Sequence, residues 1–341
     1  MNAPFQYGTL ATKENFVDRV EDRAQLKNFL SSHINVMLVS PRRWGKSSLV
    51  KVAMEELQEE DKDVRVCYIN AFSIGSEAEF YKTFASQVTA CADAQFVPKE
   101  QDKVDLLQLP EILAEALDVK IIVCISEFQQ LANLPEYKDM EGKMRSVWQQ
   151  QERVTYCLYG SKRHMMLDIF NNSNSPFYRF GQLLFLNKIS KEKWKLFIVE
   201  TFEKSGKHIS DEFTGRICDT TECHSWYLQQ CCYFVWNATA VEVTEESFNY
   251  GLKQMINTNS PMFQGDTEML AASQVEMLRA IRDGVQQLSS AEARAKYHLG
   301  NPNTISKNKR ILQNKDIVEM QDGRLVFLDP IYRLWFTKEY E

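Results

Sequence analysis

A strand, a loop and a helix follow one another between Ile34 and Met54, and this order constrains the fold more than any other feature of the sequence. Residues 34–39 form an apolar run typical of a buried parallel strand, and residues 48–54 have the spacing of an amphipathic helix. The loop between them reads Ser40-Pro41-Arg42-Arg43-Trp44-Gly45-Lys46-Ser47. It follows the phosphate-binding pattern G-x-x-x-x-G-K-S/T, except that serine replaces the first glycine. The segment therefore predicts a nucleotide-binding P-loop rather than a chance Gly-Lys-Ser.

The residue types of this loop suit phosphate binding. Gly45 lets the backbone approach a phosphate closely, Lys46 neutralises the β- and γ-phosphates, and the Ser47 hydroxyl is suited to ligate Mg²⁺. The helix that follows directs the positive end of its dipole at the anion. Pro41 and the small Ser40 still allow a sharp turn after the strand. The nucleotide-binding residues that we expect in this loop are Pro41, Arg42, Arg43, Trp44, Gly45, Lys46, Ser47 and Ser48.

Strands and helices alternate through the first half of the chain. Further strand patterns cover residues 64–70, 121–125, 154–159 and 183–186, and helical patterns cover residues 77–92, 106–117 and 143–151. Alternation of this kind is typical of a parallel sheet with helices on both faces. The sequence therefore predicts an α/β fold for residues 1–188.

The rest of the chain is mostly helical. Helical spacing continues to residue 258, after which Asn259-Ser260-Pro261 is expected to interrupt the chain. Three short helical patterns and a hairpin with Asp322-Gly323 at its turn come next, which is the pattern of a winged helix-turn-helix. We therefore expect a helical lid domain over residues 189–262 and a winged-helix domain over residues 263–341.

Composition narrows the possible partners and compartments. A net charge of −6 over 341 residues argues against a protein that coats nucleic acid along its whole surface, but it allows a local basic face. The first residues lack a signal-peptide pattern and no apolar run is long enough to span a membrane, so the sequence predicts a cytoplasmic protein without membrane contact. A cluster of cysteines near His224 lacks a C-x₂-C pair and lies in a helical pattern, which favours packing over a zinc site.

A second candidate site lies where the strand over residues 121–125 ends. P-loop hydrolases usually carry an acidic pair there, one carboxylate in the metal shell and the next one orienting water. Here Glu127 is present but Ser126 occupies the aspartate position, so we expect weak Mg²⁺ binding and slow hydrolysis. Alternatively, Glu127 is an ordinary solvated residue.

With these motifs, the chain resembles the STAND-like P-loop ATPases of the AAA superfamily, over nearly its whole length. Besides the P-loop, the resemblance rests on Phe16-Val17-Asp18-Arg19, Glu127-Phe128-Gln129, Tyr159-Gly160-Ser161-Lys162-Arg163, Ser175-Pro176-Phe177-Tyr178 and Asp329-Pro330-Ile331-Tyr332-Arg333-Leu334-Trp335. The resemblance implies ATP as the nucleotide, a strand order of 5-1-4-3-2 and a helical lid. It also implies an adenine pocket formed by Phe16, Val17 and Arg19.

The same resemblance suggests catalytic residues and marks departures from the family. It places a polar sensor at Ser161, with Lys162 or Arg163 near the γ-phosphate and Glu127 as the catalytic carboxylate. Ser47 and Ser126 would face the metal. The lid of the family carries a His-Pro pair, whereas this chain has His224-Ser225, so His224 is a capping or packing residue or a sensor.

These features favour an ATP-binding switch that hydrolyses ATP slowly and passes its nucleotide state to a partner or to the winged helix. The alternative is a DNA-binding regulator that uses the P-loop fold mainly as a scaffold. Residues 294–315 contain no acidic residue, and Lys307, Lys309 and Arg310 supply positive charge for DNA or for a protein partner. A third hypothesis is an active ATPase in which Glu77 replaces the missing aspartate. Arg42, Arg43 and Arg179 are candidates for contacts to phosphate in the same subunit or in a neighbouring subunit of an oligomer.

Overall fold

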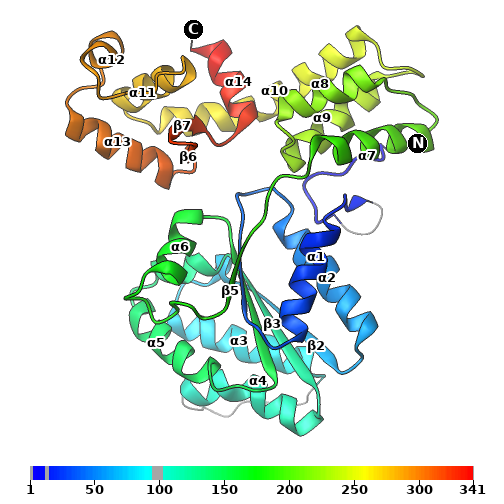
Figure 1. Cartoon of the computed structure of the whole chain (residues 1–341), viewed down its shortest axis with the longest axis vertical. Coiled ribbons are helices and arrows are strands. Elements are labelled where there is room, and N and C mark those ends of the chain that lie inside the picture. Colours follow the sequence, from blue (N-terminus) through cyan, green and yellow to red (C-terminus); the bar gives the residue numbers. More distant parts are fainter. Residues whose placement is uncertain (1–2, 12–14, 94–102, 341) are drawn as a thin grey trace. The chain divides into compact units, whose positions relative to one another are not determined.

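The chain forms two compact units, shown in a computed structural model that describes residues 3–11, 15–93 and 103–340 (Figure 1). One unit consists of Leu10–Lys188, and the other combines Met1–Thr9 with Ile189–Glu341. The chain therefore passes from one unit to the other twice.

A parallel five-stranded sheet forms the centre of the Leu10–Lys188 unit. Its strands are β1 (Val36–Val39), β2 (Val64–Asn70), β3 (Lys120–Ser126), β4 (Val154–Gly160) and β5 (Gln182–Phe185). They lie in the order β2-β3-β4-β1-β5, which confirms the predicted order 5-1-4-3-2 counted from the other edge. Because β1 pairs with both β4 and the edge strand β5, the P-loop begins at the end of an interior strand.

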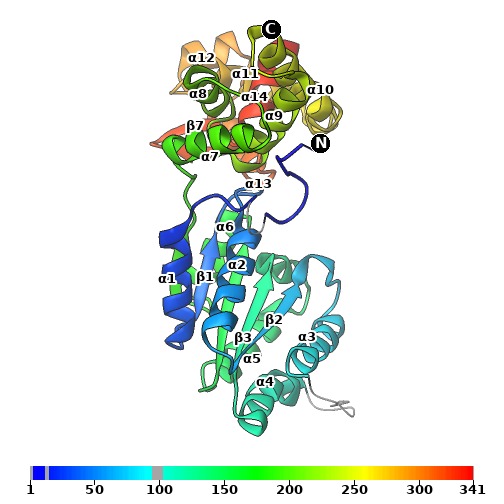
Figure 2. The same cartoon turned by 90° about the vertical axis from the view of Figure 1, so that its right-hand side faces the viewer.

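Helices cover both faces of this sheet (Figure 1 and Figure 2). The helices α1 (Val20–Ser31) and α2 (Lys46–Glu60) pack on one face, and α3 (Glu77–Cys91), α4 (Lys103–Leu117), α5 (Tyr137–Trp148) and α6 (Arg163–Asn171) pack on the other. Successive strand residues point to opposite faces: Val36 and Leu38 contact the α1–α2 side, whereas Met37 and Val39 contact the other side. A strand buried on both faces reads as a continuous apolar run, as the sequence of β1 does.

In the second unit, the segment that starts at Ile189 begins with four helices. They are α7 (Lys191–Lys204), α8 (Asp211–Thr221), α9 (Ser225–Ala238) and α10 (Glu245–Glu268). The predicted interruption at Asn259-Ser260-Pro261 is wrong, because α10 continues through Pro261. Neighbouring helices hold this stretch: Asn259 donates to Gln230 of α9, and Trp335 donates to the Ser260 hydroxyl. These side-chain contacts fix the helix next to Pro261, where one backbone hydrogen bond is lost.

The chain ends in a winged-helix arrangement. Its elements are α11 (Ala272–Arg282), α12 (Ala291–Lys296), α13 (Pro302–Asn314), β6 (Val318–Gln321), β7 (Arg324–Phe327) and α14 (Pro330–Glu339). The antiparallel hairpin of β6 and β7 turns at Asp322 and Gly323, both with positive φ, as predicted from the Asp-Gly pair. The sequence pattern did not predict α14 as a helix, although Asp329 caps it by accepting hydrogen bonds from Ile331 and Tyr332.

No helix in the described parts of the chain combines the length and the apolar character needed to cross a lipid bilayer.

Candidate nucleotide-binding site

The P-loop joins the end of β1 to the first turn of α2. Gly45 caps α2 with φ +92°, a left-handed conformation, and a Cβ atom there would meet no atom within 4 Å. The backbone angle, and not the available space, therefore requires glycine. Arg43 is also left-handed, with φ +64°. Left-handed residues in a tight loop turn neighbouring backbone N–H groups toward one concave side, which suits an anion.

Ser40 replaces the first glycine of the pattern without backbone strain, since it does not adopt a positive φ. Its side chain is almost fully buried, and its hydroxyl donates to the carbonyl of Pro41 at 3.0 Å. Its N–H group donates to the carbonyl of Gly160 on β4. The small serine side chain therefore fits the turn from β1 into the loop.

Three of the predicted site residues come together at the carboxyl ends of β1, β3 and β4. The Lys46 ammonium, at a side chain that is 7% exposed, lies 3.7 Å from Oε1 of Glu127. The other carboxylate oxygen, Oε2, accepts hydrogen bonds from the Ser161 hydroxyl and from the Gln129 amide, each at 2.7 Å. Glu127 is therefore not a solvated strand-end residue, but the centre of a polar cluster at the P-loop.

The electrostatics of this cluster favour an ionised glutamate. Burial alone would raise the pKa of Glu127, but Lys46, the hydroxyl and amide donors and Arg42 together hold the pKa below the usual glutamate value. Burial lowers the pKa of Lys46, and the attraction of Glu127 opposes this shift. Glu127 also adopts a left-handed backbone, with φ +51°, at a cost of about 1–3 kcal/mol. Strain of this kind is often found at functional sites.

Gln129 belongs to the cluster but was not among the predicted site residues. The side chain of Gln129 is fully buried and packs against Gly160. A Cβ atom at position 160 would lie 1.9 Å from Oε1 of Gln129. A larger residue at position 160 would displace this amide from Glu127. Gly160, directly before Ser161, was the only hint in the sequence that another side chain packs at the end of β4.

Ser126, predicted to face the metal, lies at the end of β3. Its hydroxyl is 3.3 Å from both the Ile69 carbonyl and the Asn70 side-chain oxygen on β2. Ser47, the other predicted metal ligand, lies half-buried in the first turn of α2. These hydroxyls and Glu127 are oxygen donors of the type that Mg²⁺ uses, but with a single carboxylate they form an electrostatically weak set.

Arg19 connects the P-loop to the segment after β5. Its guanidinium donates to the carbonyls of Trp44 and Asn187, each at 2.9 Å, and to Asp22 at 3.0 Å. Arg19 is only 4% exposed and has a left-handed backbone. Phe16 lies under the guanidinium of Arg23, and Val17 is buried. A role of Phe16, Val17 and Arg19 in adenine binding stays a prediction.

Several other predicted residues lie in different surroundings. The guanidinium of Arg163 stacks 5.1 Å from the Phe185 ring at the end of β5, and Lys162 precedes α6 as its N-cap residue. Glu77, the proposed substitute carboxylate, forms an ion pair with Lys143 at 3.9 Å. Arg42 and Arg43 are exposed, and the guanidinium of Arg179 stacks on Tyr178.

The cysteine cluster near His224 is part of helix packing. His224 is buried against the ring of Tyr227, and Cys231 and Cys232 are fully buried in α9. Among residues 3–11, 15–93 and 103–340, no group of three or more histidine, cysteine or acidic side chains is placed to hold a metal ion.

Comparisons with known proteins agree with this architecture. A family described as a probable winged helix domain matches residues 261–338. A Walker-type ATPase of Pyrococcus abyssi has a TM-score of 0.79 at 16% identity, with 98% of this chain and 99% of that chain covered. The ORC2 protein of Aeropyrum pernix, solved as ADPNP-ADP complexes, has a TM-score of 0.67 at 14% identity, with 98% and 99% covered.

A more distant structure is the Aeropyrum pernix ORC1 protein in complex with DNA, with a TM-score of 0.56 at 10% identity and 96% and 94% covered. No curated protein matches this chain by sequence. At these identities the likeness concerns the fold. The chain therefore has the fold of these Walker-type ATPase and ORC structures, with a C-terminal part that matches a winged-helix family.

Proposed function

We propose that this protein binds ATP at the P-loop and acts as a nucleotide-dependent switch of the STAND type that hydrolyses ATP slowly. The observation that carries the proposal is the buried Lys46, held 3.7 Å from Glu127 beside a left-handed Gly45. A buried ammonium next to a backbone suited to anions favours a polyphosphate ligand. The ADPNP-ADP complexes of the ORC2 protein support a nucleotide in this fold.

The residues of the cluster have separate roles in this proposal. Lys46 and the N–H groups around Gly45 would hold the phosphates, while Ser47 would contact Mg²⁺, which supplies charge neutralisation when bound. Glu127, oriented by Ser161 and Gln129, is placed to position a water molecule or to accept its proton. Arg163 and Lys162 would stabilise charge near the γ-phosphate.

Slow hydrolysis follows from the charge of the cluster. Ser126 stands at the carboxyl end of β3, where P-loop hydrolases usually have an aspartate. The metal site therefore has one negative charge fewer. Weak metal binding lowers the stabilisation of the transition state more than it lowers phosphate binding. ATP would then stay bound long enough to act as a signal.

We further propose that residues 1–188 bind the nucleotide, residues 189–262 act as a lid and residues 263–341 contact the partner. We also propose a cytoplasmic location, because buried thiols such as Cys67, Cys124 and Cys157 in the strands suit a reducing compartment.

Binding and turnover measured together test this function. With labelled ATP and Mg²⁺, we expect saturable binding and phosphate release far below the roughly 10 s⁻¹ typical of enzymes. Limited proteolysis should give different fragments for the ATP-bound and ADP-bound forms, because a switch needs two states. Fast turnover would support an active ATPase instead, and identical digestion patterns would exclude the switch.

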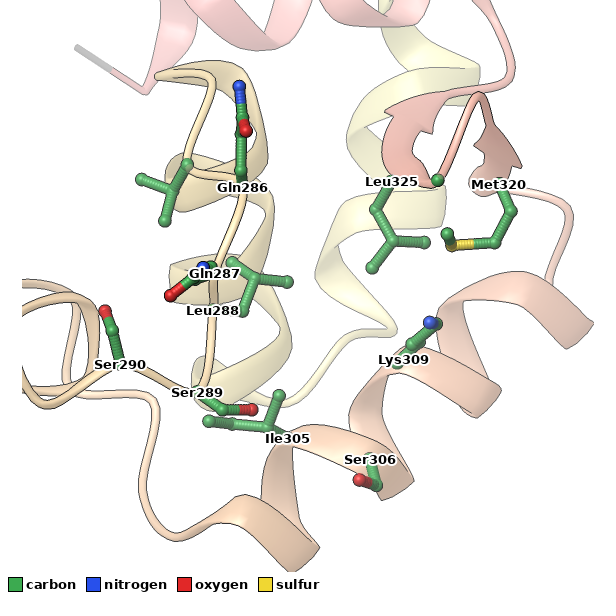
Figure 3. Close-up of a pocket in the computed structure, with 12 residues that line it drawn as sticks. Gln286, Gln287, Leu288, Ser289, Ser290, Ile305, Ser306, Lys309, Met320 and Leu325 are labelled. Atoms are coloured by element: carbon green, nitrogen blue, oxygen red, sulfur yellow. The ribbon is translucent and has the colours of Figure 1, made fainter.

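A second candidate function, DNA binding, is favoured by the outer face of α13. Asn303, Ser306, Lys307, Arg310 and Asn314 are exposed at helical spacing and include no acidic residue. Lys309, predicted with them, instead lines a cavity of about 540 Å³ together with Met320 and Leu325 of the hairpin (Figure 3). Ser306 of the exposed set lines the same cavity, so the cavity borders the face that would meet DNA.

Fluorescence anisotropy with a DNA duplex at low salt tests this candidate. Lys307→Glu and Arg310→Glu should each weaken binding about tenfold or more and reduce its salt dependence. Lys338→Glu, at an exposed position on α14, changes the net charge equally and serves as the control. Equal effects of all three variants, or no binding by the wild type, would contradict a specific role of α13.

A further inference from the structure

Both connections between the two units are fixed to the P-loop region. Beside the first connection, Thr9–Leu10, the N–H group of Ala11 donates to the hydroxyl of Ser48 on α2 at 2.9 Å. Beside the second, Lys188–Ile189, the carbonyl of Asn187 accepts a hydrogen bond from Arg19 at 2.9 Å. The same guanidinium donates to the carbonyl of Trp44 in the P-loop.

The other side of the first connection is also fixed. The ring of Phe5, 2% exposed, packs 5.3 Å from the ring of Phe202 on α7. The ring of Tyr7 lies 5.8 Å from Trp226 and 5.5 Å from Tyr233 on α9. Only Gly8, Thr9 and Leu10 lie between Tyr7 and Ala11, so the first connection is short in sequence.

The second connection is equally short. Ile189 is 7% exposed, and Ser190 caps α7 by accepting a hydrogen bond from the N–H group of Lys193. On the other side, the Lys188 ammonium lies 5.5 Å from the ring of Trp44. Few residues therefore lie between the contacts of the P-loop and the first turn of α7.

The acceptor of Arg19 belongs to the peptide group that a phosphate would contact. The carbonyl of Trp44 and the N–H group of Gly45 are parts of one planar peptide unit, so a rotation that turns the N–H group also moves the carbonyl. The planar fork of Arg19 reaches Trp44 and Asn187 through different nitrogens. A lysine has a single nitrogen on a flexible stem and is poorly suited to hold both carbonyls in this geometry.

We propose that Arg19 is a positioning residue that transmits the nucleotide state of the P-loop to the Lys188–Ile189 connection, and that Ser48 does the same for Thr9–Leu10. This inference rests on the proposed nucleotide binding. It assigns Arg19 a role in coupling the two units rather than in contacting adenine.

Amide hydrogen exchange, read by mass spectrometry with and without a non-hydrolysable ATP analogue and Mg²⁺, tests the coupling. In the wild type, nucleotide should change exchange about fivefold or more at residues 43–48, 9–11 and 187–189. Arg19→Lys should keep the change at residues 43–48 and lose it at 187–189. Ser48→Ala should lose the change at residues 9–11 and keep it at 187–189.

The control is Arg23→Lys, because Arg23 also lies on α1 but forms an ion pair with Glu56 on α2 instead of a contact with the P-loop. It should keep all three changes. Absence of protection at residues 43–48 in the wild type would overturn the proposed nucleotide binding. Protection there without a change at either connection, or an unaltered response at residues 187–189 in Arg19→Lys, would overturn the coupling alone. If Arg19→Lys does not fold, the response of Ser48→Ala at residues 9–11 decides.

Discussion

The carboxylate of Glu127 lies between the ammonium of Lys46 and the hydroxyl of Ser161, so an incoming phosphate must compete with it for the lysine. Glu127→Gln removes this competition and the repulsion between carboxylate and phosphate. We expect the variant to bind ATP about fivefold more tightly, a gain of about 1 kcal/mol, in a calorimetric titration. Glu55→Gln, which removes a charge from the exposed side of α2, is the control. Weaker binding by Glu127→Gln would mean that the glutamate orders the site.

Ser126 determines how much negative charge faces the metal. Ser126→Asp should raise Mg²⁺-dependent phosphate release about 10-fold, since single polar groups near a metal change affinity or activity by about that factor. Ser126→Asn is the control, because asparagine has nearly the same size and shape as aspartate but carries no charge. A gain in both variants, or in neither, would contradict the explanation of slow hydrolysis by a missing aspartate.

Among single residues, some contacts of the candidate site can be predicted from residue type and strand position alone, whereas the roles of these residues in binding and catalysis stay predictions. Lys46, Glu127 and Ser161 follow three strands whose carboxyl ends meet at one edge, so their proximity was predictable. The contact of Gln129 depends on the missing side chain of Gly160 on another strand. Arg19 reaches the carbonyls of Trp44 and Asn187 from a left-handed backbone conformation. Arginine has no preference for this conformation, so the sequence could not predict these contacts.

At the scale of elements, the close contact between α9 and α10 is set by Gly251. A Cβ atom there would come within 2.6 Å of Val235 on α9, whereas a Cβ atom at Gly265 on the same helix would meet nothing within 4 Å. Gly251→Ala should lower the free energy of unfolding by about 1–3 kcal/mol, and Gly265→Ala should raise it by about 0.5–1 kcal/mol. Urea unfolding measures both, and a stabilised Gly251→Ala would contradict the close packing.

Periodicity predicts a helix or strand correctly where the hydrophobic pattern of the segment itself determines its structure. The strand β2 begins and ends at the predicted residues, Val64 and Asn70. Continuation of α10 through Pro261 was not predictable in this way, because it depends on Gln230 and Trp335, which lie far away in the sequence. Tertiary contacts can override a local signal for a break.

At the scale of the whole molecule, the order of elements indicated the architecture. Alternating strands and helices predicted the parallel sheet, and three helices before a hairpin predicted the winged helix. The return of Met1–Thr9 to the second unit could not be predicted, since it depends on aromatic packing of Phe5 and Tyr7 against helices about 200 residues later in the chain. This return gives the molecule its two connections.

A nucleotide site at the P-loop is tested by the affinity for ATP of the wild type, Lys46→Ala and Lys51→Ala, measured by isothermal titration calorimetry. Lys51 lies on α2 as well, but it is half-exposed and pairs with Glu55 away from the loop. We predict that Lys46→Ala loses about 10- to 100-fold in affinity, the contribution of a charge-assisted contact, while Lys51→Ala binds like the wild type. Equal affinity of all three proteins, or no binding by the wild type, would contradict a nucleotide site at the P-loop.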